Sequence, residues 1–111
     1  MGLGDDPPPA AGGAQAERAA DVYLMQSRLD GSFDVGWTTD PVRRLVEHNA
    51  GGSRWTSHKR PWRLLGVERQ PTRDAAKRYE RTLKRSPHKL AIFKKRVLNR
   101  AANGRPRQVV G

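Results

Sequence analysis

The chain has no cysteine, few aromatic residues and no long apolar run. Of its 111 residues none is Cys, and 6% are Phe, Trp or Tyr. Without cysteine, neither a disulfide framework nor a cysteine-ligated zinc site can form, and a reducing compartment is compatible with the composition. No segment approaches the roughly 20 apolar residues of a membrane span, and the N-terminal residues lack the pattern of a secretory signal. We therefore expect a soluble, cytoplasmic protein that does not enter a membrane.

Acidic residues are absent from the C-terminal part of the chain. No Asp or Glu follows Glu80, whereas the basic residues that follow it are Arg81, Lys84, Arg85, Lys89, Lys94, Lys95, Arg96, Arg100, Arg105 and Arg107. The formal net charge of the whole chain is +11. A merely solubilising surface or an anionic membrane partner is the alternative, but soluble surfaces normally mix both signs. We expect nucleic acid as the partner, because cations that neutralise its phosphates release condensed counterions.

The length allows one folded domain, since single domains commonly contain about 100 to 150 residues. Residues 1–20 are rich in Pro, Gly and Ala and have little to bury, so they are predicted to form a disordered arm. The folded domain is expected over residues 21–85. A basic C-terminal helix and tail are expected over residues 86–111.

Alternating apolar and polar residues predict two strands, over 22–27 and 33–38, joined by a turn at Asp30-Gly31. On the second of these strands, the alternation places Asp34 on the face opposite the apolar residues Phe33, Val35 and Trp37. The run "PWRLLGVE" (61–68) predicts a third strand.

Three helices are predicted. The first begins at Pro41 after Thr39 or Asp40 as its cap and ends at the glycines at 51 and 52. Its apolar stripe comprises Val42, Leu45 and Val46, and Arg44 and His48 share a flank that is available to a ligand. The second helix, over 73–85 with Thr72 as its cap, buries Ala76, Tyr79 and Leu83. The third runs from about 87 to 101. The order ββαβαα predicts an α+β fold, a small three-stranded antiparallel sheet flanked by helices.

Five segments together resemble the GIY-YIG nuclease domain, most closely its small single-domain bacterial members. They are "DVY" at 21–23, "DVG" at 34–36, "TTDPVRRLVEHNAG" at 38–51, "RPW" at 60–62 and "AAKRYERTLK" at 75–84. The resemblance covers roughly residues 21–85, about three fifths of the chain.

The resemblance implies a divalent-metal-dependent endonuclease that hydrolyses phosphodiester bonds, with DNA favoured over RNA as its substrate. Tyr23 would correspond to the tyrosine of the first tripeptide, and Arg44 to the helix arginine that binds the scissile phosphate. His48 would be the nearby histidine of this branch. Glu80 would be the metal-binding glutamate, with Mg²⁺ or Mn²⁺ as the cofactor.

Asp34 stands where the family's second tripeptide normally begins with tyrosine. A carboxylate there can accept a proton or ligate a metal, but it also repels phosphate. Three outcomes follow from this substitution: retained activity through Tyr23 and His48, altered metal use, or a module that binds nucleic acid on the same basic surface without cleaving it. We expect an active enzyme in which Asp34 belongs to the catalytic group.

Each of these residues also has a simpler interpretation. Tyr23 fits a strand aromatic, and Arg44 fits a solvated helix arginine. His48, near the C-terminus of its helix, can interact favourably with the helix dipole. Glu80 and Lys84 can form an ordinary i,i+4 ion pair. Their joint order in the chain favours the functional interpretation.

The predicted nucleic-acid contacts lie mostly in the C-terminal half. Lys84, Lys95, Arg96 and Arg100 are expected to grip backbone phosphates without reading bases. Trp55, in a basic loop, is expected to stack on an unpaired base. No protein partner is evident.

Overall fold

The computed structural model describes residues 18–52 and 54–103. Its elements are β1 (Ala20–Ser27), β2 (Phe33–Thr38), α2 (Pro41–Asn49), α3 (Arg54–Ser57), β3 (Trp62–Gln70), α4 (Arg73–Arg85) and α5 (Pro87–Asn103). The predicted α+β fold and its order ββαβαα are confirmed, with α3 as an additional short helix. Residues 1–17 of the predicted arm and residues 104–111 of the predicted tail lie outside the described part of the chain.

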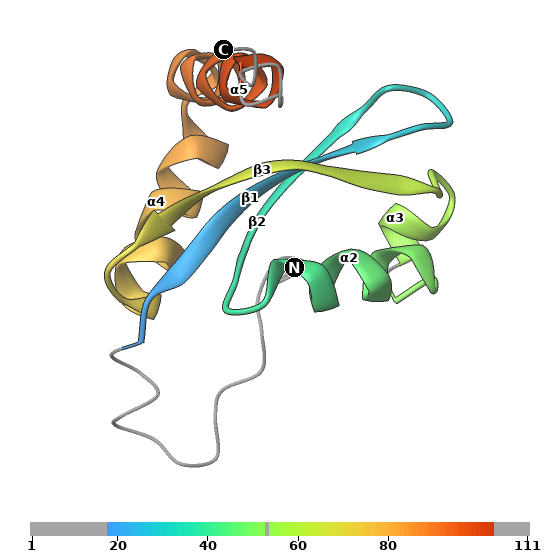
Figure 1. Cartoon of the computed structure of the whole chain (residues 1–111), viewed down its shortest axis with the longest axis horizontal. Helices are drawn as coiled ribbons and strands as arrows, with labels where there is room; N and C mark the ends of the chain where they lie inside the picture. The colour runs from blue at the N-terminus through green and yellow to red at the C-terminus, as the bar shows by residue number, and fades with distance from the viewer. Residues whose placement is uncertain (1–17, 53, 104–111) are drawn as a thin grey trace, which may run out of the picture.

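The three strands form one antiparallel sheet in the order β2-β1-β3, so that β1 is the central strand. Figure 1 shows α4 and α5 on one side of this sheet and α2 on the other. Each helix in the described part of the chain is too short or too polar to span a bilayer.

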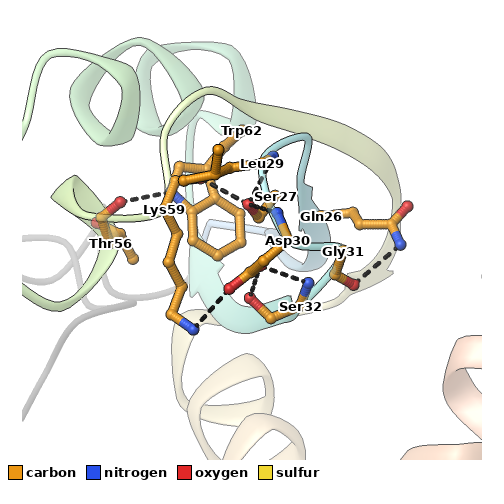
Figure 2. A network of polar contacts seen from close by, with 9 residues as sticks. All are labelled: Gln26, Ser27, Leu29, Asp30, Gly31, Ser32, Thr56, Lys59 and Trp62. Carbon is orange, nitrogen blue, oxygen red and sulfur yellow. Dashed lines mark hydrogen bonds and ion pairs between the residues drawn. The ribbon is translucent and has the colours of Figure 1, made fainter.

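The β1–β2 turn is fastened to the loop that precedes β3. Gly31 adopts a φ of +80°, a conformation that would be strained in a residue with a side chain. This matches the predicted turn. Figure 2 shows the ties between the two segments: the Ser27 hydroxyl donates to the Lys59 carbonyl at 2.7 Å, and the Lys59 ammonium contacts the Asp30 carboxylate at 3.1 Å. The Trp62 indole N–H donates to the Thr56 carbonyl at 2.8 Å, which anchors α3 to β3.

Strand alternation divides the buried side chains between the two faces of the sheet. The face under α4 and α5 holds the larger cluster, comprising Ala20, Val22, Leu24, Val35, Trp37, Ala76, Leu83, Phe93 and Val97. The opposite face holds Tyr23, Met25 and Trp62, against which Leu45 of α2 packs. Tyr23 and Asp34 therefore lie on the α2 side of the sheet, as the alternation predicted for Asp34.

Helix α2 is rotated relative to the sequence prediction. Asp40 is its N-cap, accepting from the Arg43 N–H at 3.1 Å, as predicted. However, the predicted apolar stripe was wrong for Val42 and Val46, which are 68% and 62% exposed. The helix turns Leu45 and His48 toward the sheet instead, because His48 finds a polar partner there and joins the buried residues of this face.

Helices α4 and α5 are capped at Thr72 and Ser86, whose hydroxyls accept from the Ala75 and Lys89 N–H groups at 3.0 and 3.1 Å. The bounds predicted for α4 are confirmed. Gly66 of β3 allows α5 to pack close to the strand, because a Cβ at this position would lie only 2.8 Å from the Val97 side chain.

Candidate active site

Asp34 is the centre of a buried polar group on the α2 side of the sheet. The Tyr23 hydroxyl donates to Asp34 Oδ2 at 3.3 Å, and His48 Nε2 lies 2.9 Å from the same oxygen. Tyr23 is fully buried, and Asp34 and His48 are 7% and 2% exposed. One carboxylate oxygen therefore joins strands β1 and β2 to helix α2.

Tyr23 is held in its protonated form. Burial raises the pKa of its phenol well above the ordinary value, and the negative charge of Asp34 raises it further. A hydrogen bond with Arg44 lowers it only in part. At neutral pH the phenol is thus a proton donor to Asp34 and not a phenolate.

Arg44 provides the positive charge of the group. Its guanidinium interacts with the Tyr23 phenol and donates to Glu47 Oε1 at 2.9 Å. Burial alone would lower the pKa of Arg44, but its hydrogen bonds with Tyr23 and Glu47 raise it, so this side chain stays charged. With 13% of its side chain exposed, Arg44 is more accessible than Tyr23, Asp34 or His48.

His48 differs from its sequence prediction. The helical spacing placed it on a flank available to a ligand, whereas the structure buries it between two aromatic rings. Its ring makes edge contacts with Tyr23 and Trp62, at centroid distances of 6.1 and 6.0 Å. His48 thus contacts Asp34 from inside the fold and orients this carboxylate.

Glu80 is not joined to this group. Its carboxylate pairs with Lys84 at 2.8 Å on its own helix, and α4 packs on the sheet face opposite Tyr23. Within residues 18–52 and 54–103, no hydrogen bond or ion pair links Glu80 to Tyr23, Asp34 or His48. The structure thus brings together four of the five predicted catalytic residues.

No cluster of three or more His, Asp or Glu side chains among the described residues could hold a metal ion. Glu80 nevertheless has the donor chemistry for one ion. Its side chain is 14% exposed, and its partner Lys84 is 45% exposed. Such a partly solvated i,i+4 pair is weak, so a divalent cation could displace the ammonium.

The predicted nucleic-acid contacts have different environments. Trp55 is 50% exposed, with the Lys59 ammonium 4.5 Å from its ring centroid, and Lys95 is exposed. Arg96 and Arg100, by contrast, both bind the carboxylate of Glu68 on β3, at 2.8 and 3.0 Å. The sequence prediction did not include this pairing.

Two carboxylates that pair with predicted site residues were missed from the sequence. Glu47 pairs with both Arg43 and Arg44, and its i,i+4 and i,i+3 spacing from them was a visible signal. Glu68 gave no comparable signal, because its two arginine partners are 28 and 32 residues away in the chain.

Comparison with known proteins places the chain among a defined set of relatives. Residues 20–95 match the family model of the GIY-YIG catalytic domain. The chain is 37% identical over 86 residues to a UPF0213 protein of Streptococcus sanguinis, covering 75% of this chain and 98% of that protein. It is 41% identical over 71 residues to a UPF0213 protein of Enterococcus faecalis, covering 61% and 77%.

Another relative carries a functional name. The chain is 40% identical over 70 residues to the structure-specific endonuclease subunit SLX1 of Meyerozyma guilliermondii, covering 56% of this chain and 23% of that protein. No solved structure gave a significant match.

Proposed function

Because the chain belongs to the GIY-YIG catalytic domain family, a nuclease family, we propose that it is an endonuclease that hydrolyses phosphodiester bonds, with DNA as its favoured substrate. The observation that carries this proposal is the group formed by Tyr23, Asp34, Arg44 and His48. It gathers a proton donor, a proton acceptor and a fixed cation at the motif positions of the family.

The proton of the attacking water passes through Tyr23 to Asp34. Because the phenol is protonated, it cannot accept a proton unless it gives up its own, and its hydroxyl already donates to Asp34 Oδ2 at 3.3 Å. As the water O–H bond breaks, the phenol oxygen takes that proton while its own proton moves to Asp34. His48, 2.9 Å from the same oxygen, orients the carboxylate.

Arg44 stabilises the charge that develops on the phosphate. As the most exposed member of the group it is the first that a substrate meets, and its pairing with Glu47 fixes its guanidinium before substrate arrives. A preorganised cation that faces the developing charge is among the largest contributions to catalysis.

The proposal includes one divalent cation, Mg²⁺ or Mn²⁺, held by Glu80. Mg²⁺ commonly keeps several waters and takes one or two protein carboxylates, so a single glutamate is a sufficient protein ligand. When bound, the ion would supply positive charge to phosphate oxygens of the nucleic acid, from the α4 side of the sheet opposite Tyr23.

A second candidate function is supported by the burial of the catalytic group. Tyr23 is fully buried and Asp34 nearly so, which keeps substrate from the proton-transfer atoms in this conformation. This observation favours a module that binds nucleic acid on its basic surface without cleaving it.

A cleavage assay separates the two functions. Purified protein is incubated with duplex, flapped and single-stranded DNA and with RNA, in the presence of Mg²⁺, Mn²⁺ or a chelator. We expect chelator-sensitive cleavage by the native protein. Binding of every substrate without any cleavage would refute the nuclease proposal and support the binding module.

Two matched pairs of variants test the roles of individual residues. Arg44→Ala should lower the cleavage rate by about 10²- to 10³-fold, whereas Arg43→Ala, which also removes an arginine paired with Glu47, should change it little.

Glu80→Gln should abolish metal-dependent cleavage while binding persists, with Asp74→Asn on the same helix as its control. Cleavage that persists unchanged in Glu80→Gln would overturn the metal assignment.

A further inference from the structure

A small cavity is lined by residues of α4 and α5. Both helices lie on the side of the sheet away from α2 (Figure 1). The cavity has a volume of about 180 Å³, and it is lined by Tyr79, Leu83, Lys89, Ile92 and Arg96. None of these residues belongs to the group around Asp34. The cavity therefore needs an explanation of its own.

Three of its walls are apolar or aromatic. Leu83 is buried in the core, and Ile92 is 43% exposed although it is a large apolar residue. The Tyr79 ring is fixed in place, since its hydroxyl donates to Glu68 Oε1 at 2.6 Å and its edge meets Phe93 at a centroid distance of 6.0 Å. These walls suit a flat apolar group and do not suit a bare phosphate.

The remaining walls are cationic. Arg96 donates two hydrogen bonds to Glu68, both at 2.8 Å, and a third to the Tyr79 oxygen at 2.7 Å. Because Arg100 shares the same carboxylate at 3.0 Å, two guanidinium groups face one negative charge and the cluster keeps a net positive charge.

Lys89 is the second cation that lines the cavity, beside Arg96. No carboxylate of the described residues pairs with it. It lies seven residues before Arg96 on α5, about 10 Å along the helix axis, with Ile92 between the two. Two cations thus flank an apolar floor.

We propose that this cavity binds the base of an unpaired nucleotide, with the adjoining backbone phosphates on Lys89 and Arg96. A nucleotide combines a flat apolar ring with an anion, which neither an apolar peptide side chain nor a free phosphate does. The cavity is smaller than the roughly 300 to 1,000 Å³ of drug-sized ligand sites, so it accommodates a single ring system. Bases inside a duplex are stacked and paired, so the occupant comes from an unpaired strand.

This inference rests on the proposed function only in taking nucleic acid as the ligand, and it adds that the ligand contains a single-stranded segment. The α5 helix supports it, since no acidic residue lies on that helix and its exposed side chains include Lys89, Lys95, Arg96 and Arg100.

Binding is measured by fluorescence anisotropy with chelator present, so that no cleavage interferes. The probes are a short oligodeoxythymidine, the same oligonucleotide with its central nucleotides replaced by abasic tetrahydrofuran analogues, and a duplex of equal length. The native protein should bind the base-containing single strand about fivefold or more tightly than the abasic one, since stacking contributes measurably per base. Equal affinity for the two single strands would overturn the proposal.

Matched variants locate the effect in the cavity. Ile92→Gln and the cavity-filling Ile92→Trp should each reduce the preference for the base-containing strand toward unity. Leu98→Gln, which changes another exposed apolar residue of the same helix outside the cavity, should leave the preference intact. Equal losses in Ile92→Gln and Leu98→Gln, both folded by circular dichroism, would also overturn it.

Charge variants separate the phosphate contact from the base contact. Lys89→Gln should weaken binding of both single strands more than Lys95→Gln does, without changing their ratio. A protein that keeps base-dependent binding but cleaves nothing would refute the nuclease function and leave this inference standing. One that cleaves DNA but binds abasic strands equally well would refute this inference alone.

Discussion

At the scale of single residues, Asp34 depends on its two partners. A carboxylate that is 7% exposed has lost most of its hydration, and this costs several kcal/mol unless hydrogen bonds replace the water. Tyr23 and His48 supply those contacts to one oxygen. Asp34, Tyr23 and His48 therefore form a unit in which a change at one residue alters the other two.

The first prediction concerns the charge at this position. Asp34→Asn keeps the shape of the side chain but removes the proton acceptor, so the cleavage rate should fall by about 10²- to 10⁴-fold while nucleic-acid affinity stays near the native value. Single-turnover cleavage and anisotropy measure the two quantities separately.

The control for this change is Asp21→Asn. Asp21 is also a buried carboxylate of the sheet, but its partner is Arg69 at 3.1 Å and not Tyr23 or His48. It should lose stability without the loss in rate. Equal loss of rate in the two variants would assign the effect of Asp34→Asn to folding and not to proton transfer.

At the scale of secondary-structure elements, Glu68 links three of them. It lies on β3 and accepts from Tyr79 of α4 and from Arg96 and Arg100 of α5. Hydrogen bonding to Arg96 lowers the pKa of Glu68 to about 2, from an ordinary value near 4.3. This charge helps to hold α5 against the sheet beside Gly66.

The second prediction follows from that pKa. A carboxylate with a lowered pKa stabilises the fold above its unfolded pKa, and this contribution is lost as the pH falls from about 4.3 to about 2. Glu68→Gln should therefore lower the free energy of unfolding at pH 7 by about 1 to 2 kcal/mol, a value reduced by solvent because Arg96 and Arg100 are about half exposed. The difference from the native protein should shrink toward pH 2 in urea titrations.

Glu47→Gln provides the matched control. Glu47 also pairs with two arginines, but its side chain is 43% exposed, so its loss should cost only a few tenths of a kcal/mol. A pH-independent deficit in Glu68→Gln would indicate impaired packing and not the removal of a charge.

The third prediction concerns the caps of two helices. Asp40→Ala and Thr72→Ala each remove an N-cap acceptor and should each cost about 1 kcal/mol of stability. Because α2 carries Arg44 and His48, Asp40→Ala should also slow cleavage at temperatures well below unfolding, and Thr72→Ala should slow it less. The reverse order in a rate assay would mean that α2 does not position the catalytic group.

Local patterns predicted the elements better than their orientation. The period-2 pattern of residues 33–38 correctly predicted β2. The cap and apolar stripe of residues 73–85 correctly predicted α4, because turn and cap chemistry depends on neighbouring residues. Helix α3 was missed because four residues carry no periodicity. The exposure of Val42 and Val46 was missed because the rotation of α2 follows from its contacts with β1 and β3 and from the pairing of His48 with Asp34.

The candidate site was predictable in membership more than in geometry. The motif order singled out Tyr23, Arg44 and His48, but no sequence pattern shows that one oxygen of Asp34 contacts both Tyr23 and His48. Helices α4 and α5 pack on the other face of the sheet. This packing separates Glu80 from the group around Asp34 and pairs Arg96 and Arg100 with Glu68. These are long-range contacts that local periodicity does not encode.

At the scale of the whole molecule, α2 and α5 lie on opposite sides of a three-stranded sheet (Figure 1). The candidate catalytic group lies on the α2 side, away from the cations of α5. A nucleic acid that contacts both must pass around an edge of the sheet. An unpaired strand is flexible enough to follow such a path, whereas a short duplex is stiff. The placement of the two surfaces therefore agrees with a substrate that contains a single-stranded segment.

The fourth prediction tests whether α5 contacts that strand or only adds to the field of a basic protein. Arg96 and Arg100 share Glu68, so Lys89 and Lys95, which pair with no carboxylate of the described residues, are the better probes of phosphate binding. Lys89→Gln combined with Lys95→Gln should lower affinity for single strands and flatten the slope of log K against log salt by about 0.7 for each phosphate that the protein no longer neutralises.

Arg28→Gln combined with Arg54→Gln provides the control. It removes the same charge from exposed positions in the β1–β2 turn and α3, and it should leave the slope nearly unchanged. Equal flattening by both double variants would mean that the chain attracts nucleic acid through its overall charge, because only direct binding makes the slope depend on where the charge was removed.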